Sequence, residues 1–419
     1  MPNIEIVQLL AAREAQVRLQ FRTREGLERH QHRQMLRLVK QVLPQSPYYN
    51  LLLSRPLAEW PVMNARLLGE YFDIINTLGL KKAEVADLLA TQEGQVLPGI
   101  GSCCPLLSRH GNTLFLLNTE ERLCRLGTLL AGLGNDARNI AYFFHADYLL
   151  GGDIRHEDLR IESYDLSHSY ASLRERLLLQ QPDTVIAPCA LLLRLHDDIR
   201  DGTLQIGLPN VYNCGEVLTQ RDRLKLRTLF PCVGDIYLTA EAFVGMTCGH
   251  GRLHLNETNL LVQYENLEGN RCLPLITDLH AQSLPLVQYR LNDVLVLDPL
   301  PCPCGCVHQV VRHVEGSLQD VLLLPGASRR SVRIYPEVCH GILLRNLPKD
   351  CDYQLVQQGA CQIELRAAAE EEALHHARHA LLLAWRQAGV DTARLAFHAR
   401  QTWGEHDLGQ KRRQVMRVA

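Results

Sequence analysis

Between residues 114 and 213, short apolar runs alternate with longer amphipathic segments. The strand candidates are Leu114–Leu117, Ile140–Phe144, Thr184–Ala187 and Asn210–Asn213. The helix candidates lie between them, at 120–133, 171–180 and 190–199. Strands that alternate with helices pair in parallel, because each helix returns the chain to the same edge of the sheet. The pattern therefore predicts an α/β fold with a largely parallel sheet.

The segments before and after this region have different patterns of apolar residues. Apolar residues recur at helical spacing from about Glu5 to Leu43, and 66–89 reads as short helices. After Asp320 the pattern is that of a small α+β module. Its strand candidates are 332–334, 354–357, 362–366 and 395–398, with a helix at 370–386. We predict an N-terminal helical region at 1–95 and an α/β core at 96–317, which together form a large domain, and a small C-terminal α+β domain at 318–419.

Length and charge narrow the class of protein. A chain of 419 residues is long enough for two or three domains. Its net charge of −2 gives no general attraction to nucleic acid or to acidic membranes. No apolar run reaches the roughly 18–20 residues that span a bilayer, and the N-terminus does not read as a signal peptide. We therefore expect a cytoplasmic protein with neither a nucleic-acid nor a membrane partner.

Cysteine spacing predicts a metal site. The chain has 14 cysteines, and without a secretion signal a disulfide framework is not expected. Cys302 and Cys304 are one residue apart, while Cys248 and His254 belong to a predicted hairpin. Three thiolates and one imidazole form a closed set that suits structural Zn²⁺. The competing ligands are His250, Cys306 and His308. The alternative is a group of reduced, buried cysteines.

Several short motifs carry a family resemblance. They are Asn213–Glu216, Asp235–Glu241, Tyr289–Asp293, Glu315–Asp320 and Gly409–Arg413. Their order and spacing resemble the adenylate-forming enzymes, in particular the phenylacetate-CoA ligase and coenzyme F390 synthetase branch. The resemblance implies a large α/β domain, which binds ATP or AMP, and a small mobile α+β domain joined to it by a hinge near 316–320. The order of the cysteines and the histidine is also similar to that branch.

The resemblance implies roles for the tract after the strand candidate 233–236. Tyr237 would stack on adenine, and Glu241 would hold Mg²⁺, a cation that prefers oxygen ligands. The family has a hydroxyl residue where this chain has Ala240, so the phosphate contact would fall to the adjacent Thr239. Read alone, a Tyr and a Glu at the end of a strand are ordinary structural residues.

Three other motifs carry further implied roles. Asp293 would accept hydrogen bonds from the two ribose hydroxyls, with Arg290 beside it, although Asn292–Asp293 also reads as a plain turn. Glu216 lies in the tract that borders the acyl and adenine pocket in the family. Lys411 would stabilise the charge that develops at the α-phosphate. A basic C-terminal tail is the simpler reading of Lys411 and its neighbours.

The sequence departs from the family where phosphate is bound. The glycine-rich phosphate loop should lie within 102–113, where only Ser108, Gly111 and Thr113 could take part in binding phosphate. In the hinge tract, Ser317 replaces an arginine and Gln319 replaces an acid. Glycines in such loops let backbone N–H groups surround phosphate. These changes predict weak or slow use of ATP.

The resemblance implies activation of a small carboxylic acid by ATP. Acyl-AMP and pyrophosphate would form first, and the acyl group would then pass to a thiol or an amine, such as that of CoA or a carrier protein. The alternative is a degenerate member of the family that binds a nucleotide or an acyl group as a scaffold subunit. Exchange of pyrophosphate into ATP separates these two hypotheses.

Overall fold

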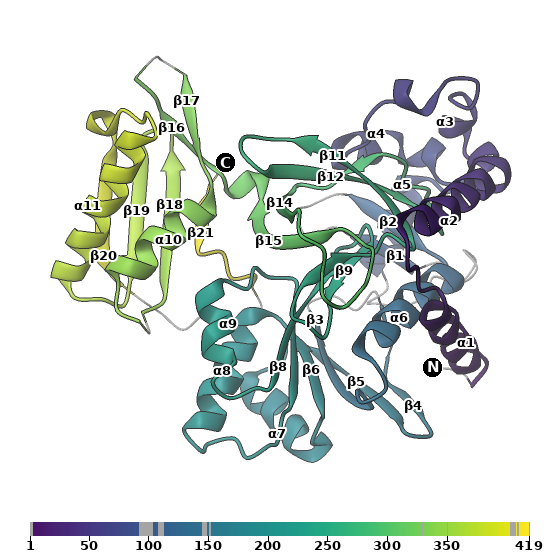
Figure 1. The fold of residues 1–419 in the computed structure, drawn as a ribbon, viewed down its shortest axis with the longest axis horizontal. Helices are drawn as coiled ribbons and strands as arrows, with labels where there is room; N and C mark the ends of the chain where they lie inside the picture. The colour runs from purple at the N-terminus through teal and green to yellow at the C-terminus, as the bar shows by residue number, and fades with distance from the viewer. Residues whose placement is uncertain are drawn as a thin grey trace.

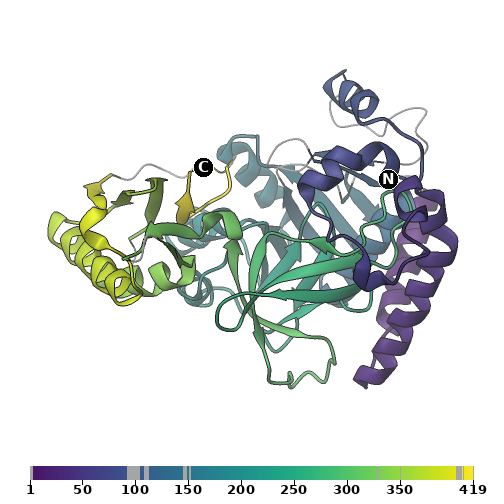
Figure 2. The ribbon, with the colours of Figure 1, turned by 90° about the horizontal axis from the view of Figure 1, so that it is seen from above.

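The computed structural model describes residues 3–91, 104–107, 113–144, 149–150, 152–327, 330–349, 351–402, 408 and 410–418. Figure 1 shows a large part built around one long twisted sheet, and a smaller C-terminal part beside it. Figure 2 shows that the C-terminal part lies at the opposite end of the molecule from the N-terminal helices. Among the described residues, no helix has both the length and the apolar character needed to cross a membrane.

The N-terminal region is helical, as predicted, but it is broken into several pieces. The helices are α1 (Asn3–Arg18), α2 (Arg24–Arg37), α3 (Pro47–Asn50), α4 (Ala65–Ile75) and α5 (Lys82–Thr91). The first long helix predicted by periodicity is interrupted at 19–23, because the Thr23 side chain accepts a hydrogen bond from the Gly26 backbone and so starts α2. A π-helical turn, Leu38–Val42, follows α2.

The large sheet has thirteen strands, in the order β11-β12-β14-β15-β10-β9-β8-β7-β6-β3-β5-β4, with β13 also paired to β12. They are β3 (Asn139–Phe144), β4 (Ile154–His156), β5 (Leu159–Asp165), β6 (Thr184–Ala187), β7 (Asn210–Cys214), β8 (Cys232–Leu238), β9 (Phe243–Thr247), β10 (Leu253–Leu255), β11 (Leu260–Asn266), β12 (Arg271–Asp278), β13 (Tyr289–Arg290), β14 (Asp293–Asp298) and β15 (Val310–Ser317). The four predicted strands between 114 and 213 are all present.

The prediction of a largely parallel sheet is wrong, because the sheet is mixed. Parallel pairing joins β5, β3, β6, β7 and β8. The helices beside these strands in Figure 1 are α6 (Thr119–Leu133), α7 (Tyr170–Gln180), α8 (Cys189–Arg200) and α9 (Gln220–Leu226). From β8 onward the pairing is antiparallel, because connections without helices join those strands. Three of the four strands predicted between 114 and 213 belong to this parallel half, whereas Leu114–Leu117 belongs to a separate hairpin.

Close packing fixes the first helix on the large part. The Asn118 side chain and Glu121 form a capping box that starts α6. A Cβ atom added at Gly127 of α6 would lie 2.8 Å from the Arg13 backbone nitrogen of α1. A glycine is therefore required where the two helices touch. A separate two-stranded hairpin pairs β1 (Cys104–Leu107) with β2 (Leu114–Leu117), and β1 lies within the segment 102–113 where the phosphate loop was predicted.

The C-terminal part has its own sheets and its own core. Its elements are β16 (Leu322–Pro325), β17 (Ser331–Ile334), α10 (Pro336–Asn346), β18 (Tyr353–Gly359), β19 (Gln362–Ala367), α11 (Glu371–Gln387), β20 (Ala396–Gln401) and β21 (Val415–Arg417). Its apolar core runs from Leu322 to Val415 and includes the fully buried Trp385. Within the described residues, no strand after Ser317 joins the large sheet. The predicted class, a large α/β unit with a small C-terminal α+β unit, is confirmed.

The junction between the two parts begins at the end of β15. Gly316 has φ +104, a conformation that side chains other than glycine rarely adopt, and a 3-10 turn at Leu318–Asp320 follows it. Glu315 is buried and accepts two hydrogen bonds from Arg271, at 2.7 and 2.8 Å. The Arg271 guanidinium lies over the Tyr335 ring at 4.2 Å. A charge pair and an aromatic contact therefore hold the junction.

Candidate functional site

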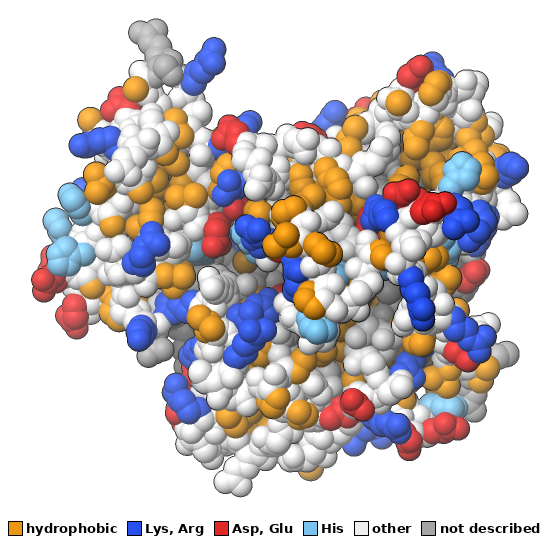
Figure 3. All heavy atoms as spheres, in the orientation of Figure 1, with side chains coloured by type: hydrophobic (Ala, Val, Ile, Leu, Met, Phe, Trp, Pro, Cys, Tyr) orange, Lys and Arg blue, Asp and Glu red, His pale blue; other side chains and the backbone are white. Residues whose placement is uncertain are grey.

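A cleft of about 620 Å³ runs between the large sheet and the C-terminal part. This volume is typical of small-molecule sites. In Figure 3, charged side chains of both signs lie along the boundary between the C-terminal part and the rest of the molecule. Five of the residues predicted from sequence line the cleft: Glu216, Tyr237, Thr239, Asp293 and Lys411. The fold thus brings together residues that are up to 195 positions apart in the chain, from Glu216 to Lys411.

Tyr237 and Asp293 form a hydrogen-bonded pair in the wall of the cleft. Tyr237 belongs to β8, and Asp293 begins β14. The Tyr237 hydroxyl donates a hydrogen bond of 2.8 Å to Asp293 Oδ2. Burial raises the pKa of Tyr237 well above its usual range, and the neighbouring Asp293 carboxylate raises it further. The tyrosine is therefore neutral and can orient the carboxylate in the cleft.

The turn between β8 and β9 carries Thr239 and Glu241. The Thr239 hydroxyl accepts a hydrogen bond of 3.2 Å from the Ala242 backbone, so it stabilises its own turn. The Glu241 carboxylate accepts a hydrogen bond of 3.3 Å from the Tyr289 hydroxyl. Burial raises the pKa of Glu241 above its usual value. Glu241 borders a small cavity with β2, the strand that directly follows the segment in which the phosphate loop was predicted.

A buried arginine, which the sequence analysis missed, fixes this turn. Arg125 of α6 donates to the Ala240 carbonyl oxygen at 3.1 Å and also to the Glu241 carbonyl oxygen. Its guanidinium forms an ion pair of 3.4 Å with Asp278 of β12. No local motif marks Arg125, because its partners lie more than 110 residues away in the chain.

Glu216 has a structural task as well as a place in the cleft. Its Oε2 accepts a hydrogen bond of 2.9 Å from the Ala190 backbone, in the first turn of α8. Its Oε1 accepts one of 2.6 Å from the Arg412 backbone. The carboxylate therefore anchors the C-terminal tail to the large part. Lys411, the residue before Arg412, faces the cleft from this anchored tail.

Two further predicted cofactor residues are not among the described residues that line the cleft. Arg290 forms an ion pair of 3.3 Å with Glu265 of β11 and is not among the residues that line the cleft. Ser108 lies outside the described residues, as does most of the segment 102–113, of which the structure describes 104–107 and 113. The cofactor roles of both residues stay predictions. In the tract where the hinge was predicted, the Ser317 hydroxyl accepts a hydrogen bond from the Gln319 backbone.

The four predicted metal ligands lie together. The ligand atoms of Cys248, His254, Cys302 and Cys304 are all within 4.8 Å of one another. Cys248 follows β9 and His254 belongs to β10, while Cys302 and Cys304 belong to the loop between β14 and β15. The sulfur atoms of Cys248 and Cys302 are 3.6 Å apart, and Cys304 Sγ is 3.5 Å from His254 Nε2.

The geometry of this cluster fits a closed structural zinc site. Three thiols and one imidazole supply four ligands, the usual number for structural zinc. Of the competing ligands, His308 bonds the Thr258 hydroxyl at 3.1 Å instead. Cys306 stays outside the cluster, although its backbone nitrogen contacts Cys304 Sγ. The twelve cysteines whose side chains the structure describes are all free, so no disulfide among them competes for these thiols.

The fold is similar to that of adenylate-forming ligases. No protein-family model matches the sequence, and no curated protein matches it. Among solved structures, 2-hydroxyisobutyryl-CoA ligase in the postadenylation state with R3-HIB-AMP superposes with a TM-score of 0.62 at 14% identity, over 94% of this chain and 88% of that chain. The same ligase with 2-HIB-AMP gives a TM-score of 0.59 at 15% identity, over 100% and 90% of the two chains.

An amide bond synthetase has a more distant similarity. The enzyme McbA from Marinactinospora thermotolerans has a TM-score of 0.52 at 11% identity, over 78% of this chain and 76% of that chain. Identities this low establish a shared fold and nothing finer. The chain therefore has the fold of adenylate-forming enzymes.

Proposed function

We propose that this protein activates a small carboxylic acid with ATP and transfers the acyl group to a thiol or an amine. One observation carries the proposal. Tyr237 and Asp293 from the large sheet, and Lys411 from the C-terminal tail, line a single cleft in a fold shared with adenylate-forming ligases. These are the three positions at which the sequence resemblance places adenine, ribose and the reacting phosphate.

The proposed reaction has two steps. A carboxylate oxygen attacks the α-phosphorus of ATP, which forms the mixed anhydride bond of acyl-AMP and breaks the α–β phosphoanhydride bond, so that pyrophosphate leaves. A thiol or amine then attacks the acyl carbon, AMP leaves, and the nucleophile's proton passes to solvent. The similar structures include a CoA ligase and an amide bond synthetase. CoA, a carrier-protein thiol and a free amine are therefore the acceptor classes to test.

Each side chain has a proposed task. The neutral Tyr237 ring provides a flat surface for adenine, and its hydroxyl holds the Asp293 carboxylate toward the ribose hydroxyls. The Lys411 ammonium stabilises negative charge that develops at the α-phosphate. Glu241 would hold Mg²⁺, which neutralises charge on the phosphates. The ionised form that Mg²⁺ requires is disfavoured by burial before the cation binds.

The cysteine cluster has a separate task. Cys248, His254, Cys302 and Cys304 would hold Zn²⁺ as a closed set, which leaves no coordination position for a substrate. The metal would tie the β9–β10 turn to the loop before β15, and β15 leads directly into the hinge. Domain limits at 1–95, 96–317 and 318–419 remain our prediction, supported by the separate core of the C-terminal part.

A second function is a scaffold that binds a nucleotide or an acyl group without catalysis. The observations that favour it concern phosphate binding. Ala240 supplies no hydroxyl, and the hydroxyl of the adjacent Thr239 is engaged by its own turn. In the predicted hinge, Ser317 occupies the position at which the adenylate-forming enzymes have an arginine.

Hydroxylamine trapping tests the proposal. The protein is incubated with ATP, Mg²⁺ and a panel of aliphatic and aromatic acids, and acyl-AMP is detected as its hydroxamate. We expect hydroxamate with at least one acid, and about 10²-fold less from the Lys411→Ala variant, because that amine acts in the transition state. Nucleotide binding without hydroxamate from any acid would instead support the scaffold.

A further inference from the structure

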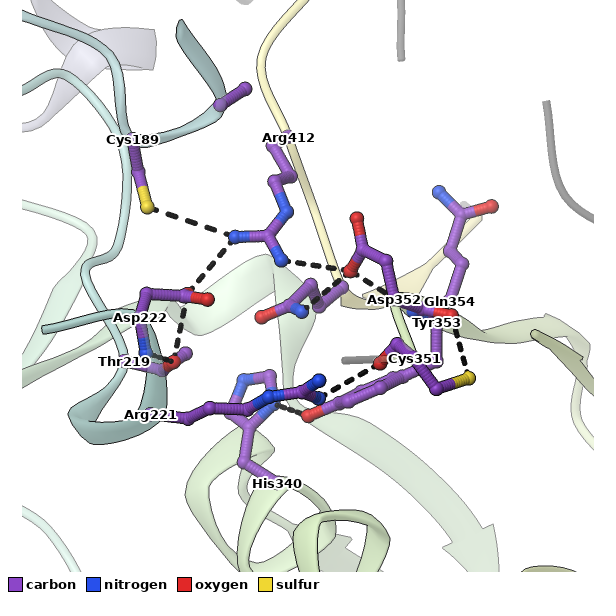
Figure 4. Close-up of polar contacts among 12 residues, drawn as sticks. Cys189, Thr219, Arg221, Asp222, His340, Cys351, Asp352, Tyr353, Gln354 and Arg412 are labelled. Atoms are coloured by element: carbon purple, nitrogen blue, oxygen red, sulfur yellow. Dashed lines mark hydrogen bonds and ion pairs between the residues drawn. The ribbon is translucent and has the colours of Figure 1, made fainter. Parts of the chain in front are cut away.

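The Arg412 side chain is buried where the tail, the large part and the C-terminal part meet (Figure 4). Only 9% of the side chain is exposed. Its Nη1 donates to Asp222 Oδ2 of α9 at 3.0 Å, and its Nη2 donates to Asp352 Oδ1 at 2.8 Å. Asp222 belongs to the large part, whereas Asp352 lies directly before β18 of the C-terminal part. One guanidinium thus joins both parts.

The two carboxylates are themselves held in place. Asp222 accepts a hydrogen bond of 2.8 Å from the Thr219 hydroxyl. Asp352 accepts one of 3.0 Å from the Gln414 side chain and one of 3.0 Å from the Tyr353 backbone. Burial alone would raise the pKa of Asp352, but the Arg412 charge and these hydrogen bonds outweigh it and lower the pKa. With the tail in place, the Asp352 carboxylate is therefore ionised, and hydrogen bonds orient both carboxylates.

A second contact crosses the same boundary. Arg221, next to Asp222 on α9, donates a hydrogen bond of 2.8 Å to the Cys351 carbonyl oxygen. The Arg412 backbone nitrogen is also held, by Glu216 at the edge of the cleft. Because Lys411 immediately precedes Arg412, these contacts fix the backbone from which the Lys411 side chain enters the cleft.

We propose that Arg412 is a positioning residue for acyl-adenylate formation: by bridging Asp222 and Asp352 it holds the Lys411 amine in the cleft. This proposal rests on the proposed function. Arginine suits the position, because its fork reaches two carboxylates at once, whereas the single ammonium of lysine cannot span them in the same way. Arg412 itself does not line the cleft in which the reaction is placed.

The test separates the two half-reactions in the full-length protein. Arg412→Gln removes the charge, and Lys411 is needed only for adenylate formation. We expect kcat for pyrophosphate exchange to fall about 10-fold or more, with KM for ATP changed less than about threefold, because Tyr237 and Asp293 stay in place. Transfer from supplied acyl-AMP to the acceptor should change less than about threefold. Arg412→Lys should recover part of the lost kcat.

A matched control is Arg366→Gln. Arg366 pairs with Glu364 on β19, inside the C-terminal part, so both half-reactions should keep their wild-type rates. Equal losses in both half-reactions of the Arg412→Gln protein would overturn the proposal, because they would report a general loss of fold. A wild-type rate of exchange in that variant would overturn it as well. Should Arg412→Gln fail to fold, Asp222→Asn makes the same test.

A physical readout separates this proposal from the proposed function. Hydrogen exchange in the absence of substrates follows the Val415–Arg417 amides, which belong to the strand paired with β18. We expect these amides to exchange at least about 10-fold faster in Arg412→Gln than in Arg366→Gln. If no acid supports the exchange of pyrophosphate into ATP but the tail amides exchange hydrogen faster in Arg412→Gln, the proposed function fails. The role of Arg412 in holding the tail is then still supported. If the tail amides exchange hydrogen at the same rate in both variants, Arg412 does not hold the tail and the proposal is overturned.

Discussion

Replacement of Asp293 by alanine probes the nucleotide site most sharply. Asp293 lines the cleft at the start of β14, and its Oδ2 accepts the Tyr237 hydroxyl at 2.8 Å. In the proposed complex its carboxylate also accepts hydrogen bonds from both ribose hydroxyls. Asp293→Ala therefore removes two contacts to ATP together with one contact inside the protein.

The size of the effect follows from these contacts. A hydrogen bond to a charged group contributes about 1.5–3 kcal/mol, so the loss of two weakens ATP binding by about 3–6 kcal/mol, or roughly 10²- to 10⁴-fold. The Tyr237 hydroxyl loses its partner, but it borders the cleft, where water can replace the carboxylate. We therefore expect a loss of stability near the lower end of the usual range, about 1 kcal/mol.

Tyr237→Phe is the matched control, because it removes the same internal hydrogen bond and keeps the carboxylate. It should lose similar stability in thermal unfolding, yet ATP affinity should fall less than about tenfold, since the ring and the carboxylate remain. Titration calorimetry at fixed salt measures both affinities. If Asp293→Ala binds ATP as tightly as Tyr237→Phe, Asp293 does not hold the ribose and the reasoning fails.

Three further predictions concern the metal, the junction and the hinge. Purified protein should contain about one zinc per chain. The Cys302→Ser variant should lose most of that zinc and unfold at a lower temperature. Metal analysis that finds no zinc in the wild-type protein would contradict the proposed zinc site. Burial alone would raise the pKa of Glu315, but His313, 3.6 Å away, and Arg271 outweigh burial and lower the pKa below about 4.5. The ion pair between Glu315 and Arg271 therefore stabilises the fold above that pH. This stabilisation is lost as the pH falls through the lowered pKa. Glu315→Gln should therefore cost about 1.5–3 kcal/mol in denaturant unfolding at pH 7 and much less near pH 3, and an equal cost at both values would refute the charge pair. Gly316→Ala should cost about 1–2 kcal/mol, because φ is +104 there, whereas Gly341→Ala inside α10, where no strain or close contact exists, should cost nothing.

Local periodicity and short motifs predicted many of the strands and several of the cleft residues, because these features depend on residues that are close together in the sequence. The strands at Thr184–Ala187 and Asn210–Cys214 follow from short apolar runs between helices, and buried parallel strands require such runs. The cleft residues Tyr237 and Asp293 were found because their motifs keep a characteristic order. The cluster of four candidate metal ligands was predicted because thiols and an imidazole recur at hairpin spacing.

The features that were missed depend on contacts between distant segments. Apart from the hairpin that carries Cys248 and His254, the antiparallel half of the sheet was not predicted, because hairpins rather than helices join its strands. Arg125 and Arg412 look like ordinary charged residues in sequence, and the partners that they contact, Ala240 and Asp222, lie 115 and 190 positions away. Tertiary structure alone gives such residues their importance.

Exchange of labelled pyrophosphate into ATP is the most direct test of the central claim. The wild-type protein is assayed with Mg²⁺ and a broad panel of carboxylic acids, beside Asp293→Ala and Lys411→Ala. We predict exchange that depends on an acid, is abolished by Asp293→Ala through lost binding, and is slowed about 10²-fold by Lys411→Ala while ATP still binds. Wild-type protein that binds ATP but exchanges no pyrophosphate with any acid would contradict the claim.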